Sequence, residues 1–271
     1  MTENLGAATD SAGFPAAAGA AGLTSAPDPV ARSSARVAQL SAALNTLNER
    51  IDAACEAAGR ARDTVRLLPV TKFHPASDIE ILYGLGLREF GESREQEASD
   101  KVAQLRHLSQ VRWDFIGRLQ RNKAKSVATW ANTVYSVDSD RLVTTLDAGV
   151  RAALETGQRS APLRVLIQVS LDADPTRGGV SDTAMLALAD QLEKSASLQL
   201  AGLMAIPPLD ADPDDAFERL ARMHASLLSA HPQASELSAG MSSDLEAAIR
   251  HGSTCVRVGT ALMGARPITS A

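Results

Sequence analysis

The chain has 271 residues, of which 45% are apolar and 22% charged, with a formal net charge of −5 and a pI near 5.6. This composition predicts a soluble globular protein, with no general attraction to nucleic acid or to an acidic membrane surface. No segment approaches the roughly 18 uncharged apolar residues that a membrane span needs. We therefore expect no membrane and no nucleic-acid partner, and any phosphate-binding site must be local.

Two cysteines, Cys55 and Cys255, are too few for a disulfide framework and leave one optional bridge. This cysteine usage favours a reducing compartment, so we expect a cytoplasmic protein.

The ends of the chain differ in composition from its middle. Residues 1–30 are rich in alanine and glycine and lack the basic start and apolar block of a secretion signal, so we expect a disordered tail. A transit peptide is less favoured, because the first arginine is Arg32. Residues 31–267 are predicted to form one domain and residues 268–271 a second short tail.

The first element expected is a helix from Ala31 to Ala58, since apolar residues recur at three- and four-residue steps between Val37 and Ile51. Short apolar runs then alternate with longer helical patterns. The runs expected to form strands are Arg66–Thr71, Arg88–Phe90, Arg112–Ile116, Thr133–Val137, Leu163–Val169, Leu198–Ala205, Ser235–Ser238 and Cys255–Val258. The helical patterns between them include Ala76–Leu85, Gln96–Leu105, Arg141–Glu155, Thr183–Lys194, Pro213–Leu228 and Asp244–His251.

This alternation predicts an α/β fold in which helices cover a parallel sheet. Eight strand–helix units suit a single closed (β/α)8 TIM-type barrel better than an open doubly wound sheet, which usually has five or six strands. In such a barrel the functional residues lie where strands end and the following loops begin.

Small and hydroxyl residues follow the last two predicted strands. Gly240 to Asp244 leads into a helix, and Gly259 and Thr260 open a short helical turn. For either turn alone, an N-cap or an ordinary turn residue is the favoured explanation, because such short patterns are common by chance. The loops after strands 7 and 8 are, however, the usual phosphate site of this barrel, and free amides at helix starts bind anions. Together the two turns favour a phosphate ligand.

Lys72 ends the first predicted strand, where alternation directs its side chain toward the barrel mouth. An apolar mouth lowers the pKa of the amine, which supplies the neutral form that a Schiff base requires. The alternative is a rim lysine whose stem packs on the barrel while its ammonium stays in water. Because the first and last strands adjoin in a closed barrel, Lys72 and the two anion turns would bracket a ligand with a carbonyl and a phosphate.

Six motifs follow one another along the chain: Val70-Thr71-Lys72, Phe90-Gly91-Glu92, Phe115 to Lys123, Gly202 to Pro207, Gly240 to Asp244 and Val256 to Thr260. In this order they resemble those of the pyridoxal phosphate homeostasis protein family, single-domain relatives of the N-terminal barrel of alanine racemase. The resemblance covers about Val37 to Arg266. The resemblance implies the type III fold of enzymes that use pyridoxal 5'-phosphate (PLP), PLP as the cofactor, and a role in intracellular PLP homeostasis.

The resemblance also implies which residues contact the cofactor. Lys72 is expected to carry PLP as a lysine aldimine, and the residues after strands 7 and 8 to hold its phosphate. Arg257 is expected at the pyridine nitrogen, where a permanent cation disfavours ring protonation and weakens the ring as an electron sink. The alternative for Arg257 is a surface ion pair. The full expected set is Lys72, Ser93, Met204, Ser242, Arg257, Gly259 and Thr260.

Three positions depart from the family pattern. Ser93 stands where an asparagine usually follows Gly-Glu, and Asp114 where a histidine usually precedes Phe-Ile-Gly. Arg177 stands where lysine is common, which keeps the charge but changes the geometry. None of these changes removes the lysine or the phosphate turns.

Metal and RNA sites are not expected. The five histidines show no ligand spacing and neither cysteine has a CxxC partner. The run from Arg118 to Lys125 carries four basic residues but no interleaved aromatics, so a solvated helix start is favoured over RNA binding.

The first functional hypothesis is a carrier or regulator of PLP without committed catalytic activity, which exchanges the cofactor with PLP-requiring apo-enzymes. The second is an amino-acid racemase or related PLP enzyme that uses Lys72 as one base. By resemblance, a racemase takes its second base from an additional β domain, and the five residues after Arg266, where the resemblance ends, are expected to be too few to form one. Tyr83 and Tyr135 lie in the predicted barrel body. We therefore favour the carrier, as a monomer; a barrel for another phosphorylated metabolite is a weaker third hypothesis.

Overall fold

The computed structural model describes residues 29–172, 178–208 and 210–266. The proposed tails, apart from Pro29 and Val30, and the departure at Arg177 lie outside these residues. The described strands are β1 (Arg66–Pro69), β2 (Glu89–Glu92), β3 (Arg112–Phe115), β4 (Thr133–Val137), β5 (Leu163–Gln168), β6 (Leu198–Met204), β7 (Glu236–Ser238) and β8 (Cys255–Val258). The eight predicted strands are thus confirmed, with ends that shift by at most two residues.

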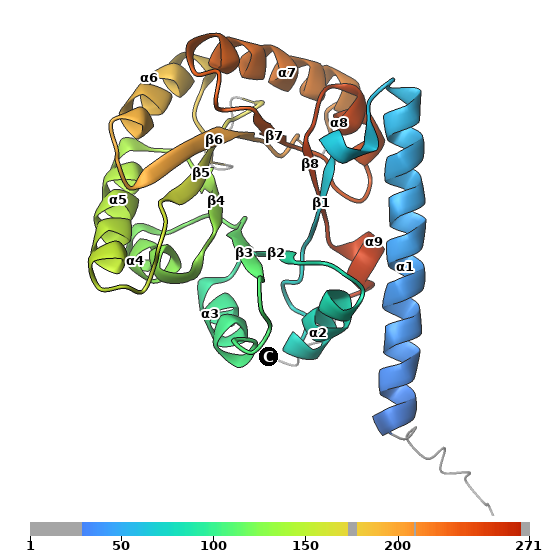
Figure 1. Ribbon diagram of the computed structural model, residues 1–271. Coiled ribbons are helices and arrows are strands. Elements are labelled where there is room, and N and C mark those ends of the chain that lie inside the picture. The colour runs from blue at the N-terminus through green and yellow to red at the C-terminus, as the bar shows by residue number, and fades with distance from the viewer. Residues whose placement is uncertain (1–28, 173–177, 209, 267–271) are drawn as a thin grey trace, which may run out of the picture.

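The helices surround these strands, and one short 3-10 turn, η1, precedes β1 (Figure 1). Their bounds are α1 (Pro29–Ala57), η1 (Arg62–Thr64), α2 (Ala76–Gly84), α3 (Glu95–Gln104), α4 (Arg121–Trp130), α5 (Asp140–Glu155), α6 (Asp182–Glu193), α7 (Pro213–Ala230), α8 (Leu245–Arg250) and α9 (Thr260–Met263). The sequence analysis anticipated α4 only as the start of a helix within the basic run from Arg118 to Lys125.

The strands pair in parallel in the order β1-β8-β7-β6-β5-β4-β3-β2. The ring closes between β1 and β2 through one bridge, Val70 to Gly91, where the Thr71 N–H donates to the Gly91 carbonyl over 3.0 Å. β1 pairs along its whole length with β8, so the first and last strands lie side by side. The expected (β/α)8 barrel is confirmed, and its carboxyl-terminal mouth brings the first strand's loop beside those of the last two strands.

Apolar side chains fill the barrel from several strands at once. Leu68, Tyr135, Leu166, Ala201 and Cys255 form a buried cluster inside the ring together with Met204. Larger apolar clusters fill the space between the strands and the surrounding helices. The barrel is therefore a packed core, and a ligand finds room only at its ends.

The backbones of the neighbouring strands β6 and β7 approach each other closely at Gly202, which lies within β6. Its φ of +154° is rarely adopted by other residues, and an added Cβ would lie 1.8 Å from the Glu236 carbonyl oxygen of β7. β5 and β6 change register beside it, between Val165 and Leu166. Glycine is required here because only hydrogen fits between the two backbones.

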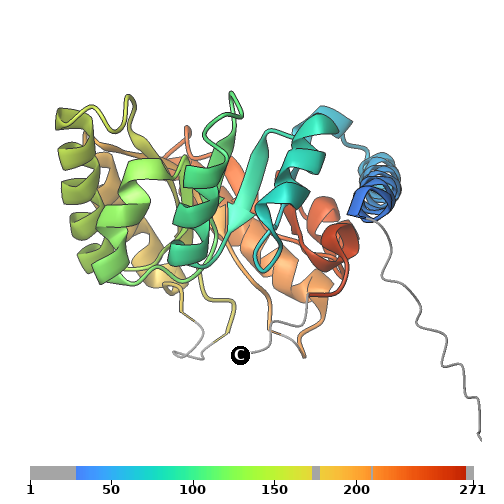
Figure 2. The same ribbon diagram turned by 90° about the horizontal axis from the view of Figure 1, so that it is seen from below.

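Helix α1 lies outside the ring and runs along one side of the barrel, where Figure 2 shows it nearly end-on. Leu40, Leu44, Leu47 and Ile51 are buried at the helical spacing that the sequence predicted. The Arg36 guanidinium donates to Asp78 of α2 over 2.6 Å and to the Met263 carbonyl of α9 over 3.0 Å. Arg50 binds Glu246 of α8 over 2.7 Å and the Ser242 carbonyl over 3.1 Å. α1 therefore ties the first unit of the barrel to the last two.

An ion cluster occupies the end of the barrel where the strands begin. Arg66, the first residue of β1, pairs with Glu89 of β2 and lies 3.0 Å from Glu236 of β7 and 3.5 Å from Asp114 of β3. The Tyr135 hydroxyl donates to Asp114 over 2.8 Å. Burial raises the pKa of the Asp114 carboxyl to about 6, against the opposing effect of Arg66. The charged side chains at this end of the barrel therefore form ion pairs mainly with one another.

Neither cysteine takes part in the bridge that the sequence left open, because Cys55 and Cys255 are both free and buried. Within the described ranges, no three histidine, cysteine or acidic side chains gather as a metal site would require. No helix in the same ranges has both the length and the apolar character needed to cross a membrane.

Candidate functional site at the barrel mouth

Lys72 lies in the turn that follows β1, not in the strand itself. The strand ends at Pro69, Val70 makes the closing bridge, and Lys72 is the first residue of a turn. Phe73, next to it, has a φ of +68°, a left-handed conformation that costs a non-glycine residue roughly 1–2 kcal/mol. The prediction that the strand runs to Thr71 was therefore two residues too long, and the turn, not strand alternation, sets the direction of the Lys72 side chain.

The Lys72 amine is half-buried among charged groups from three elements. Burial lowers its pKa, and repulsion by Arg266 and Arg257 lowers it further. The carboxylates of Glu92 and Glu97 oppose this shift. Since the net direction is downward, a larger fraction of neutral amine exists near neutral pH than for an exposed lysine. This is the electrostatic state that a lysine needs as a nucleophile toward a carbonyl.

The loops that follow β7 and β8 touch each other directly. The backbone N–H of Ala261, in α9, donates to the Ser242 hydroxyl over 3.2 Å. Gly259 adjoins the loop between β1 and α2 that carries Lys72, called the lysine loop below. An added Cβ on Gly259 would lie 3.6 Å from Val70, and the Val70 N–H donates to the Val258 carbonyl over 2.8 Å. Thr260 is the first residue of α9. The structure thus brings the Lys72 loop and both predicted anion turns to one part of the mouth.

The helix that follows the Ser242 loop is shorter than predicted. It runs from Leu245 to Arg250, with Asp244 at its N-cap position, so Ser242 and Ser243 do not cap it. The Asp244 side chain instead accepts from the Met241 N–H over 2.5 Å, which folds the loop back on itself. The Ser242 hydroxyl is therefore directed to the neighbouring loop after β8 and not into its own helix.

Arg257 is buried in β8, and so the alternative of a surface ion pair is wrong. Its guanidinium donates to the Ser238 hydroxyl over 2.7 Å and to the Ala205 carbonyl over 3.0 Å. Burial lowers the pKa of this guanidinium, since its partners are mainly neutral oxygens. A buried cation held by neutral groups favours an anionic or electron-rich ligand beside it.

Met204 and Ser93 occupy different parts of the barrel end. Met204 is the last residue of β6 and belongs to the buried cluster inside the ring, directly before the Ala205 carbonyl that binds Arg257. Ser93 follows β2 and is packed against Gly117 so closely that an added Cβ on Gly117 would lie 2.2 Å from the Ser93 carbonyl oxygen. Met204 thus lies under the mouth, whereas Ser93 lies at its rim, with β1 and β8 between its strand, β2, and the strand of the Ser242 loop, β7.

The sequence analysis missed a charged network behind Lys72. The Lys101 ammonium, in α3, lies 2.8 Å from Glu92 and 2.7 Å from Glu97, and it also donates to the Thr71 carbonyl over 2.8 Å. The i, i+4 spacing of Glu97 and Lys101 after the Gly91-Glu92 motif was the signal that could have shown part of it. Their contact with the lysine loop depends on how α3 docks, which spacing alone does not give.

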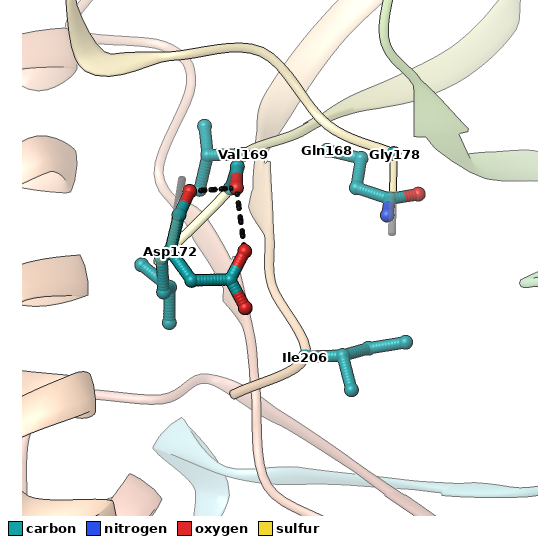
Figure 3. Close-up of a pocket in the computed structure, with 7 residues that line it drawn as sticks. Gln168, Val169, Asp172, Gly178 and Ile206 are labelled. Atoms are coloured by element: carbon teal, nitrogen blue, oxygen red, sulfur yellow. Dashed lines mark hydrogen bonds between the residues drawn. The ribbon is translucent and has the colours of Figure 1, made fainter. Parts of the chain in front are cut away.

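A separate cavity of about 200 Å³ lies at the ends of β5 and β6. Figure 3 shows Gln168, Asp172, Gly178 and Ile206 around it. The Ser170 hydroxyl binds Asp172 there, over 2.5 Å to the carbonyl oxygen. None of the seven expected cofactor residues lines this cavity, and its carboxylate does not favour a phosphate. The Lys72 amine and the two turns predicted to bind an anion lie elsewhere, after β1, β7 and β8.

Comparisons with known proteins agree with this arrangement. The family model described as "Alanine racemase, N-terminal domain" matches residues 43–267. A pyridoxal phosphate homeostasis protein of Mycobacterium tuberculosis is 53% identical over 247 residues, which are 87% of this chain and 96% of the relative. One from Escherichia coli is 37% identical over 228 residues, covering 82% of this chain and 95% of the relative.

Solved structures give the same fold. PipY of Synechococcus elongatus, solved with PLP bound, has a TM-score of 0.72 and 33% identity, covering 83% of this chain and all of that one. Alanine racemase of Streptomyces coelicolor has a TM-score of 0.61 at 19% identity, covering 81% of this chain but 58% of the racemase, and this likeness concerns the fold alone. On its sequence and its barrel, the chain belongs to the pyridoxal phosphate homeostasis protein family, which shares the alanine racemase N-terminal domain.

Proposed function

We propose that this protein binds PLP reversibly, as a Schiff base on Lys72, and serves in intracellular PLP homeostasis. The observation that carries the proposal is the meeting of a half-buried amine of lowered pKa with the joined loops of Ser242 and Ala261. The relatives named as PLP homeostasis proteins and the PLP-bound structure of PipY support PLP as the cofactor.

The groups at the mouth fit the chemistry of this cofactor. PLP supplies an aldehyde, which condenses with a primary amine to form a Schiff base and water. Ser242, Gly259 and Thr260 are proposed to bind its phosphate through hydroxyl and amide groups. Arg257, fixed by Ser238, is proposed to face the ring nitrogen without giving it a proton.

Met204 and Ser93 complete the proposed set. The buried position of Met204 beneath the Arg257 partners suits an apolar contact under the cofactor ring. Ser93, at the rim beside Gly117, is proposed to contact the cofactor from the opposite side of the mouth.

Absorbance spectroscopy tests the proposal directly. Purified protein mixed with PLP should develop the band of a Schiff base, and borohydride should convert it to a stable adduct that mass spectrometry locates on Lys72. Lys72→Ala should lose both signals while circular dichroism stays unchanged. An adduct on another lysine, or an unchanged band in Lys72→Ala, would remove Lys72 from the proposal.

A racemase is the second candidate, favoured by the shared fold of alanine racemase. Its weakness is the second base, because neither tyrosine of the chain is placed for that role. Tyr135 is fully buried and bound to Asp114, and Tyr83 is on α2, where the Arg88 guanidinium stacks on its ring. Chiral analysis after incubation with L- and D-amino acids separates the candidates: sustained turnover far above that of free PLP would reject the carrier.

The partners and location follow from the carrier proposal. We expect a cytoplasmic monomer that delivers PLP to PLP-requiring apo-enzymes. Transfer to an apo-enzyme faster than from an equal concentration of free PLP would support delivery. Light scattering of the purified protein tests the monomer, and cell fractionation tests the compartment.

A further inference from the structure

Both peptide groups that flank Lys72 are bound by one buried ion cluster. On one side, the Lys101 ammonium donates to the Thr71 carbonyl over 2.8 Å. On the other side, the Phe73 N–H donates to the Glu97 carboxylate over 2.6 Å. The same Glu97 oxygen accepts from Lys101 over 2.7 Å, which joins the two contacts.

Glu92 connects this cluster to the barrel wall. Its carboxylate accepts from Lys101 over 2.8 Å and from the Thr71 hydroxyl over 2.7 Å. Glu92 is fully buried in β2 and Lys101 is 4% exposed in α3. The lysine loop is thus tied both to the neighbouring strand and to the helix that follows it.

The loop needs such support because of its conformation. Phe73 is held at a φ of +68°, which is unfavourable for a residue with a Cβ and persists only where the surroundings determine it. The Arg94 and Arg266 guanidinium groups lie 5.4 Å and 4.8 Å from the centre of the Phe73 ring. Without the Glu97 contact, the Phe73 N–H would lose the acceptor that fixes this turn.

Fold stability alone does not account for the cluster. Two buried opposite charges are costly to desolvate, and apolar residues of similar size often stabilise a fold as well or better. One oxygen of Glu92 is buried without a hydrogen-bond partner among the residues that the structure describes, and burial raises the pKa of this carboxyl. A cluster that is expensive for the fold and bound to both sides of one side chain is best explained by the placement of that side chain.

We infer that Lys101, Glu92 and Glu97 form an ionic clamp that positions Lys72 for Schiff-base formation, an inference that rests on the proposed function. The clamp residues are positioning residues, since they hold the backbone around Lys72. They also act on its charge state: Arg266 and Arg257 face the amine and lower its pKa, whereas Glu92 and Glu97 raise it. The clamp therefore sets both the direction in which the Lys72 amine points and the pH at which this amine loses its proton.

Glu97→Ala with Glu95→Ala as its matched control tests the positioning. Both glutamates lie on α3 and are partly exposed, but Glu95 binds Ser126 over 2.5 Å and Lys123 over 3.0 Å, away from the lysine loop. In Glu97→Ala, amide exchange at Phe73 should accelerate in the protein without PLP. The limiting rate of Schiff-base formation at high pH should fall about 10- to 100-fold. Glu95→Ala should match the wild type in both measurements.

The pH profile of Schiff-base formation separates the clamp from a purely structural role. Glu92→Gln keeps the shape and one acceptor oxygen but removes the charge that raises the pKa of Lys72. The midpoint of the rate profile should therefore move to lower pH, while the Thr71 and Lys101 contacts remain possible. A role in stability alone would leave this midpoint unchanged, and that result would overturn the electrostatic part of the clamp.

The most disruptive variant, Lys101→Met, leaves two carboxylates without their cation and is expected to lose stability as well as rate. If it does not fold, Glu97→Ala still decides the positioning. Equal limiting rates and equal Phe73 exchange in Glu97→Ala and Glu95→Ala would overturn the clamp while the Lys72 adduct persists. Failure of the wild type to form that adduct would instead reject the proposed function, and the exchange measurement separates the two results.

Discussion

The two ends of the barrel handle buried charge differently. Where the strands begin, Arg66 is surrounded by Glu89, Glu236 and Asp114, so one cation meets several carboxylates. Where the strands end, Lys101 pairs with Glu92 and Glu97, but Arg257 is buried against the neutral Ser238 hydroxyl and Ala205 carbonyl. Arg66 at the first end thus has carboxylate partners, whereas the hydrogen-bond partners of Arg257 at the second end are neutral.

We expect this difference to separate the end of the barrel that stabilises the fold from the end at which PLP is proposed to bind. Buried charges that satisfy each other mainly affect unfolding, whereas a buried cation with neutral partners gains most when an anion arrives. Changes at the two ends should therefore affect different measurements. Four substitutions examine this contrast.

The largest effect is expected for Arg66→Met. The change leaves the buried Asp114 without its cation, and it takes one of two arginine partners from the partly buried Glu89 and Glu236. The free energy of unfolding should fall by up to about 3–5 kcal/mol, the cost of breaking a buried ion pair. Arg112→Met is the control, because Arg112 also pairs with Glu89 but is 54% exposed and should cost about 1 kcal/mol or less. Urea titration gives both values. A lowered PLP affinity in folded Arg66→Met would break the contrast between the ends.

Asp114→Asn should change how stability depends on pH. The pKa of Asp114 is raised to about 6 in the folded protein, against about 4 in an unfolded chain, so its ionisation destabilises the fold as pH rises from 4 to 6. Asparagine removes this loss, and the stability of the variant relative to the wild type should increase by at most about 3 kcal/mol over that range. Urea titrations at pH 4, 5, 6 and 7 measure the difference, and a constant difference would contradict it.

Arg257→Met should show the reverse of Arg66→Met, with a small effect on stability and a larger effect on PLP affinity. Two hydrogen bonds to neutral oxygens are lost and a desolvated charge is removed, so the free energy of unfolding should change by less than about 2 kcal/mol. The Kd for PLP should rise about 10- to 100-fold, as expected for a lost charge-assisted hydrogen bond. Arg159→Met is the control, since Arg159 also binds backbone carbonyls, at Ala128 and Ala131, but belongs to no cofactor loop. An unchanged Kd would exclude Arg257 from the site.

The smallest effect is expected for Ser242→Ala. The Ser242 hydroxyl makes one hydrogen bond, to the Ala261 N–H, and is one of several proposed phosphate contacts. The Kd for PLP should rise about 3- to 10-fold, in line with one neutral hydrogen bond. Ser243→Ala, a change at the adjacent serine, should leave the Kd unchanged. Fluorescence titration of both variants distinguishes a specific contact from a general effect on the loop.

The sequence was most informative where local pattern decides structure. Eight strands and the long helix before them followed from apolar runs and periodicity, because burial on a sheet or a helix face imposes those patterns. Gly259 was singled out as the residue that opens a helical turn, and Gly202 only as part of a family motif. The structure gives the reason at Gly202, where only hydrogen fits between β6 and β7. Lys72 was singled out because a lysine at a strand end is unusual in a chain with five lysines, and its role in binding PLP stays a prediction.

The features that the sequence did not show depend on contacts between elements. The α8 start at Leu245 and the orientation of Ser242 toward Ala261 arise from two loops that meet only after the barrel closes. The same holds for Lys101, which is an ordinary helix residue by pattern but reaches Thr71 across 30 positions. One sequence gives the spacing within an element but not the docking of one element on another.

The path of α1 has a consequence for synthesis on the ribosome. Arg36 contacts Met263 across 227 positions, and Lys72 lies beside a loop that is made almost last. A nascent chain that has released α1 and β1 can pair them early with α2 and β2, but both elements must wait for α8, β8 and α9 before all their contacts form. On the proposed function, the PLP site is therefore assembled only when the last barrel unit has been made.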